Sequence, residues 1–380
     1  MKPWRSIFTV VPDVHAGIGH YQSLWQRHFY DGMAEAVPQL TMPQGIDFSW
    51  IERDPLADRE KVSHQRAKAS QQLWDQIRRV HSREGLDAVI SYCFAGDLEL
   101  DLVREVIRMG VPWINFFCDS THRFLEIEAL ARVVSLNWFP EHAAIERYRA
   151  VGAACFCQPY AMNPRHLADA VSQECRIPVA FIGLPSANRI TQLGWLLLGG
   201  IRIQIHGHGW QSDQGPFHNP HQPARRRLWR ALGQPDFWEK VSRRLLWPLV
   251  KKHASGPLSD DEFPEFLRHC GLILGMNQGR DEHGRLASYL KFRDLEFPGM
   301  GCCYLTEYNQ DVEGAFELDR EVLAYRSLGE AKEKIRFYLR HPDSARAIGI
   351  AGRRKVLAQH TWSVRMAQMA EALGKRVAGG

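Results

Sequence analysis

Four charged residues alternate with four apolar ones in LKFRDLEF, residues 290–297. Helical spacing puts the apolar side chains on buried faces and leaves Lys291, Asp294 and Glu296 at the amino-terminal end of a predicted helix. The unpaired backbone N–H groups at such an end, together with Lys291, can bind a phosphate. Glu296 can accept hydrogen bonds from the two vicinal hydroxyls of a ribose. The stretch therefore predicts a nucleotide site, with an ion-pair network inside the helix as the alternative.

A second basic candidate follows the apolar run VAFI. The sequence there continues as GLPSANR, in which Gly183 predicts a turn and Arg189 lies six residues further on, beside Asn188. An arginine at this place can bind a diphosphate through bidentate, charge-assisted hydrogen bonds. The alternative is an arginine on the surface that binds no ligand.

The first apolar run, SIFTVVP, leads into a loop with two glycines and two histidines. Glycine lets the backbone approach a ligand closely, and the start of the following helix favours an anion. The third glycine of a dinucleotide-binding fingerprint is missing, so a tight strand-to-helix turn is the alternative. We expect the loop to line the ligand cleft through His15, Gly17, Gly19 and His20.

An acidic residue, Asp119, follows the apolar run INFFC and lies three residues before His122. Its carboxylate could cap the next helix. Alternatively it could face the cleft and, with His122, carry proton transfer. We expect Asp119 to face the cleft.

The elements that position these residues alternate between short apolar runs and longer amphipathic segments. Uninterrupted apolar strands separated by helices predict a parallel sheet covered on both faces. Ligands bind at the carboxyl ends of such strands. In the first half we predict strands over residues 6–12, 46–51, 86–94, 112–119, 131–139 and 153–160, and helices over 21–37, 59–85, 97–110 and 140–152.

A second alternation begins after residues 161–178, which we interpret as a linker. A chain of 380 residues is too long for one ordinary domain. We therefore predict a first Rossmann-like domain over 1–168 and a second over 177–361, with a ligand cleft between them. In the second half we expect strands over 179–185, 201–210, 272–277, 302–305 and 321–326, and helices over 188–200, 262–271 and 328–377.

Composition excludes several classes of protein. The 48 basic and 43 acidic residues leave a net charge of only +5, far from the density of a dedicated nucleic-acid binder. No apolar run reaches the length of a membrane span, and the N-terminus has no signal-peptide core. The eight cysteines lack paired CxxC spacing, which indicates free thiols in a reduced, cytoplasmic protein with no zinc site.

One segment interrupts the second alternation, residues 211–258. Its part 225–252 carries nine basic residues among tryptophans and a phenylalanine. Basic charge with tryptophan is typical of a helix that lies on an anionic membrane, which would make the protein peripheral to the inner face of the membrane. The alternative is an insertion helix whose aromatic side chains pack on the domain.

The chain from residue 290 to 362 resembles the C-terminal signature of the CgeB-like, spore-maturation-type glycosyltransferases. The matching order is K-x-R-D-x-E-x-P, then Tyr-Leu-Thr-Glu, an acidic helix, E-V-x-x-Y-R, R-x-Y-L-x-H-P and H-T-W. VAFIG, HGHGW, FFCDS and QPYAMNP are similar to the family in order and type. The resemblance implies the GT-B fold, in which two Rossmann-like domains with parallel sheets face each other across a cleft and a C-terminal helix, here 362–380, crosses back to the first.

The resemblance also implies roles for single residues. Glu296 matches the second of two donor-binding glutamates eight positions apart, which holds the ribose, while Ser288 stands at the place of the first. Arg189 falls where the family has a phosphate-binding lysine. The family's other basic residue is replaced by Leu184, with Lys291 or Arg285 as substitutes. We expect the donor to contact Gly183, Asn188, Arg189, Ser288, Tyr289, Lys291 and Glu296.

The predicted activity is the transfer of a sugar from a nucleoside diphosphate sugar to a glycan, lipid-linked sugar, protein or small metabolite, with no metal and no cofactor. Arg189 and Lys291 would stabilise the leaving diphosphate, and Asp119 or His20 would be the base or polariser on the acceptor side. The alternatives are a nucleotide-sugar epimerase of the same fold and a non-catalytic nucleotide-sugar sensor or assembly protein. A nucleic-acid binder that uses residues 225–252 is a further alternative.

Overall fold

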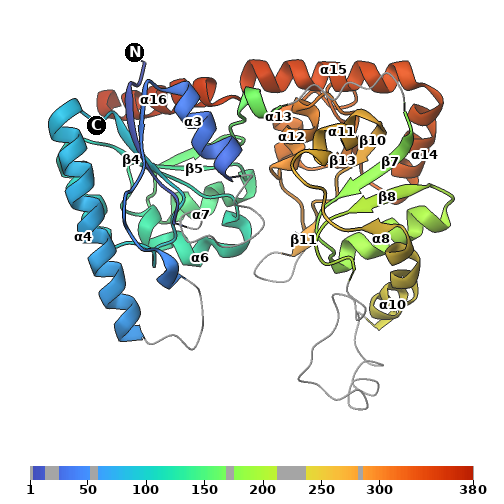
Figure 1. Cartoon of the computed structure of the whole chain (residues 1–380), viewed down its shortest axis with the longest axis horizontal. Coiled ribbons are helices and arrows are strands. Elements are labelled where there is room, and N and C mark those ends of the chain that lie inside the picture. Colours follow the sequence, from blue (N-terminus) through green and yellow to red (C-terminus); the bar gives the residue numbers. More distant parts are fainter. Residues whose placement is uncertain are drawn as a thin grey trace. The chain divides into compact units, whose positions relative to one another are not determined.

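The structure, a computed structural model, divides into two compact units (Figure 1). The first unit comprises Met1–Leu167, Arg280–Phe292 and Val356–Gly380, and the second comprises Ala168–Gly279 and Arg293–Lys355. The short segment Arg280–Phe292 thus belongs to the first unit although its neighbours in sequence belong to the second. The residues that the structure describes are 3–12, 25–51, 59–167, 175–211, 237–280 and 286–379.

The first unit is built on a six-stranded sheet in the order β2-β1-β3-β4-β5-β6, and every pairing in it is parallel. The predicted parallel sheet is therefore confirmed. Most of its strand residues are buried, as the apolar runs indicated. The strands are β1 (Ser6–Val10), β2 (Gln39–Thr41), β3 (Ala88–Ser91), β4 (Trp113–Phe116), β5 (Leu136–Phe139) and β6 (Cys155–Cys157).

Helices α3 to α7 lie in the connections between these strands, and α16 comes from the C-terminal end of the chain. Their bounds are α3 (Asp31–Ala36), α4 (Arg59–Glu84), α5 (Leu100–Arg108), α6 (Ser120–Ala131), α7 (Ile145–Ala150) and α16 (Trp362–Gly379). The long helix α4 buries Ala69, Leu73 and Ile77, spaced four residues apart, in a core with β1, β3 and α5. It ends at Gly85, whose φ of +73° suits glycine at a helix C-terminus. The predicted helix over 59–85 is confirmed.

The strand predicted over residues 46–51 is wrong. This stretch forms a 3₁₀ turn at Ser49–Ile51, and the second strand of the sheet is the three-residue β2. Phe48 and Ile51 are buried against the α4 core from the turn, so their apolar character reports burial and not a strand. The residues of β2 are only half-buried, which left no apolar run to recognise.

The second unit also has a six-stranded parallel sheet, in the order β14-β13-β10-β7-β8-β9. Its strands are β7 (Ile177–Ile182), β8 (Ile203–His206), β9 (Ala254–Ser255), β10 (Cys270–Leu274), β13 (Tyr304–Glu307) and β14 (Leu323–Tyr325), and two-residue strands β11 (Gly279–Arg280) and β12 (Leu286–Ala287) pair separately. Its helices are α8 (Ala187–Leu198), α10 (Phe237–Lys252), α11 (Glu262–Arg268), α12 (Arg293–Gly299), α13 (Gln310–Ala315), α14 (Leu328–Arg340) and α15 (Pro342–Gln359).

Helix α10 is the described part of the basic, tryptophan-rich segment, and it packs along α8 (Figure 1). Trp247 is buried and stacks on Trp210 with ring centroids 6.0 Å apart. Leu246 and Val250 lie in the same core. This tryptophan therefore packs on the domain, whereas Arg244 and Leu245 on the same helix are exposed.

The last helix belongs to the first unit, as the fold prediction required. The second unit ends inside α15, and α16 packs against α3. Trp362, the first residue of α16, lies edge-on to Phe29 and Trp138 and donates its indole N–H to the carbonyl of His28. A Cβ added at Gly32 would lie 2.4 Å from the Trp362 ring, so only glycine fits there.

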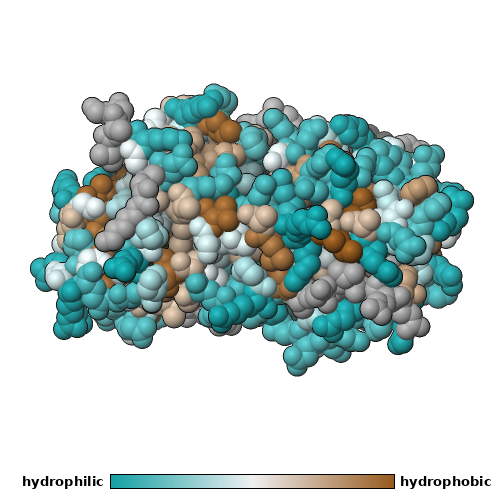
Figure 2. Space-filling model, turned by 90° about the horizontal axis from the view of Figure 1, so that it is seen from above, coloured by the Kyte–Doolittle hydropathy of each residue, from teal (hydrophilic) through white to brown (hydrophobic). Residues whose placement is uncertain are grey.

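Among the described residues, no helix is long and apolar enough to cross a membrane. The face shown in Figure 2 is mostly hydrophilic, with apolar residues in small scattered groups. All eight cysteines are free.

Candidate functional site

The order of strands in the second unit singles out one place on its sheet. From β7 the chain moves outwards through β8 to β9, and then returns to place β10 on the opposite side of β7. The direction of winding thus reverses between β7 and β10. In open parallel sheets, ligands bind at the carboxyl ends of the two strands on either side of such a reversal. The loops that follow β7 and β10 are therefore the first candidate for a ligand site.

The loop after β7 turns at Gly183, beside the side chain of Arg293. A Cβ at Gly183 would lie 2.6 Å from Nη1 of Arg293, and that nitrogen donates to the carbonyl of Ile182 at 2.9 Å. Trp210 donates its indole N–H to the Gly183 carbonyl at 2.6 Å. The missing side chain of Gly183 thus makes room for a guanidinium group at the end of β7. Arg293 is one of the four charged residues of the stretch 290–297, but nothing in the sequence indicated this contact.

Helix α8 begins at the same loop. Ser186 caps it, accepting a hydrogen bond from the backbone N–H of Arg189 at 3.3 Å. The guanidinium of Arg189 donates to the carbonyls of Met276 and Leu184, at 3.1 and 2.8 Å. Asn188 donates to the side chain of Gln278 at 3.0 Å. Asn188 and Arg189 therefore connect the loop after β7 with the loop after β10, across the reversal.

A buried carboxylate fixes the loop after β10. Glu307, at the end of β13, accepts the backbone N–H groups of Asn277, at 2.8 Å, and of Gln278. It also accepts a hydrogen bond from the side chain of Gln192 on α8. Glu307 is thus the residue that sets the shape of this loop. It was part of the Tyr-Leu-Thr-Glu motif, but its role was missed because its partners are distant in sequence.

The charged stretch 290–297 differs from its prediction. Helix α12 begins at Arg293, so Lys291 precedes the helix and does not lie on it. Asp294 is fully buried and accepts hydrogen bonds from Asn277, Tyr304 and Thr306, which makes it part of the core and not of an exposed helix end. Asp294 and Glu296 lie in the first turn of α12, as predicted, whereas the prediction for Lys291 is wrong because apolar spacing alone did not mark where the helix starts.

The predicted donor residues are divided between the two units. Gly183, Asn188, Arg189 and Glu296 lie in the second unit, with Glu296 half-buried on α12. Ser288, Tyr289 and Lys291 lie in the segment that belongs to the first unit.

In the first unit, Tyr289 and Lys291 meet Asp119, which follows β4. Lys291 Nζ lies 3.4 Å from Asp119 Oδ1, and the Tyr289 hydroxyl donates to the same oxygen at 3.2 Å. The ammonium group of Lys291 also lies 3.6 Å from the centre of the Tyr289 ring. The centre of the His122 ring lies 5.0 Å from the centre of the Tyr289 ring. Burial raises the pKa of Tyr289, so its hydroxyl stays protonated and acts as a donor. The cluster therefore holds a carboxylate, an ammonium and a phenol at the carboxyl end of the sheet.

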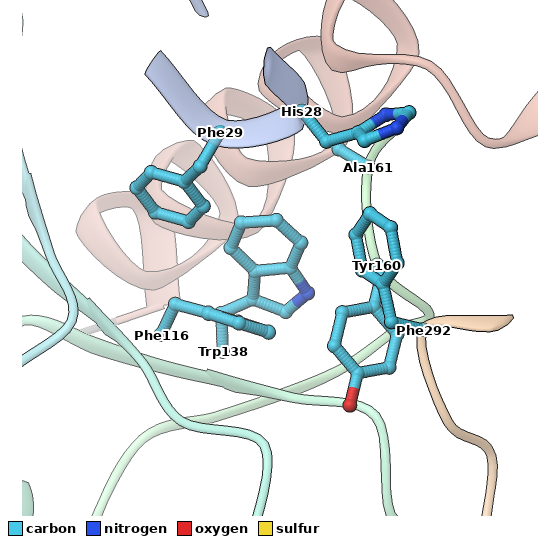
Figure 3. Close-up of a pocket in the computed structure, with 7 residues that line it drawn as sticks. All are labelled: His28, Phe29, Phe116, Trp138, Tyr160, Ala161 and Phe292. Carbon is cyan, nitrogen blue, oxygen red and sulfur yellow. The ribbon is translucent and has the colours of Figure 1, made fainter. Parts of the chain in front are cut away.

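Phe292 anchors this segment on the first unit. Its ring lies edge-on to His28 and Tyr160, at 4.9 and 5.4 Å between centroids. These three rings line a small pocket, shown in Figure 3, with a cavity of about 10 Å³ that is room for roughly one water molecule. The other lining residues are Phe29, Phe116, Trp138 and Ala161. Such a pocket holds a side chain in place and is too small for a substrate.

A second carboxylate in the first unit was not singled out from the sequence. Glu141 follows β5, is fully buried, and accepts hydrogen bonds from the backbone N–H and the hydroxyl of Thr121. Burial raises its pKa from 4.5 to about 7. In sequence it lies in the first turn of the predicted helix 140–152, and no local pattern signals its burial.

Several predicted residues fall outside the part of the chain that the structure describes. These are His15, Gly17, Gly19 and His20 of the first loop, Arg285, and residues 225–236 of the basic segment.

Comparison with known proteins gives one family match. A family model described as glycosyl transferase-like matches residues 190–371, just under half of the chain. This range contains β10, α12 and β13, with Glu307, Asp294 and Arg293. A search of curated proteins finds no match.

Solved structures match over nearly the whole chain. A sucrose-phosphate synthase from Thermosynechococcus elongatus aligns with a TM-score of 0.58 at 12% identity, over 99% of this chain and 100% of the other. AviGT4, a glycosyltransferase involved in avilamycin A biosynthesis, aligns with a TM-score of 0.52 at 14% identity, over 100% and 99%. Anabaena HepE, in complex with UDP and glucose, aligns with a TM-score of 0.51 at 10% identity, over 98% and 99%. The chain therefore has the GT-B fold, two Rossmann-like parallel-sheet units, and its second unit contains most of the glycosyl transferase-like region.

Proposed function

We propose that the protein is a glycosyltransferase of the CgeB-like type that moves a sugar from a nucleoside diphosphate sugar to an acceptor. The second unit would bind the donor and the first unit the acceptor. The observation that carries the proposal is the placement of Arg189 and Arg293 on either side of the Gly183 turn, at the reversal of the sheet. Both guanidinium groups are held by backbone carbonyls, so neither is neutralised by those contacts.

The donor would lie with its diphosphate at the Gly183 turn. Arginine is suited to this task because its planar group offers several N–H donors to phosphate oxygens. The backbone N–H groups at the start of α8 add partial positive charge. Glu296 would accept hydrogen bonds from the ribose. The complexes of HepE with UDP and with UDP-glucose support a nucleotide-sugar donor for this fold.

These basic groups would act mainly as the sugar leaves. As the bond between the anomeric carbon and the diphosphate oxygen breaks, the electron pair goes to the diphosphate, whose charge increases. Fixed positive groups that meet this charge stabilise the transition state more than the ground state. We propose that Arg189 and Arg293 supply this stabilisation and that no metal ion is needed. Arg293 takes the role of the basic residue that Leu184 replaces.

The acceptor would bind at the Asp119 cluster. A hydroxyl oxygen of the acceptor attacks the anomeric carbon, and its proton passes to the Asp119 carboxylate as general base. Lys291 and Tyr289 orient that carboxylate from the side. Ser288, at the place of the first family glutamate, lies in the same segment and not in the donor unit.

The proposal is tested by measuring donor consumption. UDP-, GDP-, dTDP-, CDP- and ADP-sugars are incubated with oligosaccharide, lipid-linked, peptide and small-metabolite acceptors, and release of the diphosphate is measured for the wild type, Arg293→Gln and Arg336→Gln. Arg336 is the matched control, since it also donates to a backbone carbonyl of the second unit, that of Gly199, but its side chain is exposed on α14. We expect one donor to be consumed with an acceptor, and Arg293→Gln alone to slow the reaction by a factor of about 10² to 10³.

Two results contradict the proposal. Conversion of the nucleotide sugar into an isomer without any acceptor would indicate an epimerase. A donor that binds but is never consumed would indicate a sensor or assembly protein.

A further inference from the structure

Glu141 is a buried acid that the proposed reaction does not use. Its Oε2 atom accepts both hydrogen bonds from Thr121, one of them from the hydroxyl at 2.6 Å. Its Oε1 atom is buried and has no hydrogen-bond partner among the residues that the structure describes. A buried carboxylate oxygen without a partner is costly. A glutamine could accept the same two bonds, so the carboxyl group adds one property only, an ionisable proton.

The position of Glu141 ties it to the proposed acceptor site. Thr121 lies two residues after Asp119, and the turn between them is closed by the N–H groups of His122 and Arg123, which donate to the Asp119 carbonyl at 3.0 and 2.9 Å. Glu141 is thus hydrogen-bonded, through Thr121, to the same turn that contains Asp119.

The charge of Glu141 also reaches the pair formed by Asp119 and Lys291. Burial raises the pKa of Glu141 to about 7, and the charge of Asp119 adds to this effect, whereas the hydrogen bonds from Thr121 and the charge of Lys291 lower the pKa. The other titratable groups that face Glu141 are Cys118, Tyr148, Tyr160 and Tyr289, and burial raises the pKa of each, so they stay neutral near pH 7. Among the described residues, Asp119 and Lys291 are thus charged side chains that act on Glu141.

We propose that Glu141 is a positioning residue that sets the net charge of the site around the Asp119–Lys291 pair, and with it the ability of Asp119 to take a proton from an acceptor hydroxyl. When Glu141 is protonated, Lys291 balances Asp119 and the three groups together are neutral. When Glu141 is ionised, Lys291 is shared by two carboxylates and the site carries one negative charge. Asp119 is then the stronger proton acceptor. The catalytic consequence of this inference rests on the proposed function. The electrostatic coupling between Glu141 and the Asp119–Lys291 pair does not.

The catalytic consequence is tested by the pH dependence of acceptor glycosylation, as kcat/KM for the acceptor between pH 5.5 and 8.5. In the wild type we expect the rate to rise by about tenfold through a midpoint near pH 7. In Glu141→Gln the side chain is neutral at every pH, so this rise should vanish and the rate should stay at its low-pH level. Glu141→Asp, which keeps an ionisable group, should keep a rise.

The matched control is Glu146→Gln, the same chemical change on the neighbouring helix α7, where the side chain is 80% exposed. It should leave the profile unchanged. A wild-type profile that is flat near pH 7, or a rise that persists unchanged in Glu141→Gln, overturns the proposal.

The electrostatic coupling between Glu141 and the Asp119–Lys291 pair is tested without an activity assay, by carbon-13 NMR of protein labelled at the glutamate carboxyl carbons. We expect one resonance to titrate near pH 7, to disappear in Glu141→Gln, and to titrate at a higher pH in Lys291→Met because a nearby cation is lost. If the midpoint does not move in Lys291→Met, Glu141 does not sense the pair and the inference fails. If the midpoint moves but no donor and acceptor react, the coupling stands and it is the proposed function that fails.

Discussion

Lys291 and Asp119 are 172 residues apart in sequence, yet Lys291 Nζ lies 3.4 Å from Asp119 Oδ1. Lys291 reaches Asp119 because residues 280–292 belong to the first unit, where Phe292 is inserted between His28 and Tyr160. The ion pair is about one-third exposed on each side, so its contribution to stability is small. The ion pair matters because of its location at the carboxyl end of β4, where both of its charges act on the buried Glu141.

Replacing Asp119 with asparagine should remove the proton acceptor and preserve the shape of the side chain. We expect kcat for sugar transfer to fall by a factor of about 10² to 10⁴, with no change in the thermal shift produced by the diphosphate. Parallel measurements of transfer rate and melting temperature check both statements. Full turnover by Asp119→Asn would remove this residue from the role of base.

Glu307→Gln should weaken donor binding. The variant loses the negative charge that accepts the N–H groups of Asn277 and Gln278, and hydrogen bonds to charged groups contribute about 1.5–3 kcal/mol. A loop that is held less firmly should raise the dissociation constant of the diphosphate by about ten- to a hundredfold, as measured by titration calorimetry.

The control for this variant is Glu330→Gln, which removes a carboxylate that also accepts a backbone N–H, that of Arg326, at an exposed helix start. Equal losses in the two variants would show that a general weakening of the second unit, and not the loop after β10, is responsible.

The stability of the protein should depend on pH through Glu141. Its pKa is raised from 4.5 in an unfolded chain to about 7 in the folded protein, so the folded state binds the proton more tightly. The free energy of unfolding therefore falls as the pH rises between these values, and is constant above them. Relative to Glu141→Gln, the wild type should lose about 2–3 kcal/mol between pH 5 and pH 8, measured by urea unfolding. A constant difference between the two proteins across this range would contradict the assignment.

Gly32→Ala should disturb the docking of α16. The added methyl group would overlap the Trp362 ring, and overpacking of this kind costs about 1–3 kcal/mol. Gly329→Ala is the matched control, because the nearest atom to its added Cβ, Ser327 Oγ, is 3.7 Å away and alanine favours the helix. Thermal unfolding should show a lower melting temperature for the first variant and an equal or higher one for the second. Equal stability of Gly32→Ala and the wild type would show that Trp362 repacks freely.

The sequence predicted the parallel sheets because buried strands lie in uninterrupted apolar runs, such as the run from Val179 to Ile182 in β7. It placed Asn188 and Arg189 correctly after β7, since helix α8 follows that strand directly. It did not reveal that Lys291 would meet Asp119, or that Glu307 would hold the loop at Asn277, because both contacts depend on the folded path of the chain. It also passed over Glu141, whose burial comes from the packing of β5 against α6 and leaves no local pattern.

The central claim is that the second unit binds a nucleoside diphosphate at the Gly183 turn. The most direct test is a thermal-shift panel of UDP, GDP, dTDP, CDP and ADP against the wild type, Arg293→Gln, Glu296→Ala and the control Arg336→Gln. A diphosphate present at a hundred times its dissociation constant should stabilise the fold by about 2.7 kcal/mol. We expect one diphosphate to raise the melting temperature of the wild type and of Arg336→Gln, and Arg293→Gln and Glu296→Ala to lose most of the rise. If no diphosphate stabilises the wild type, or if the two site variants respond as the wild type does, the claim is contradicted.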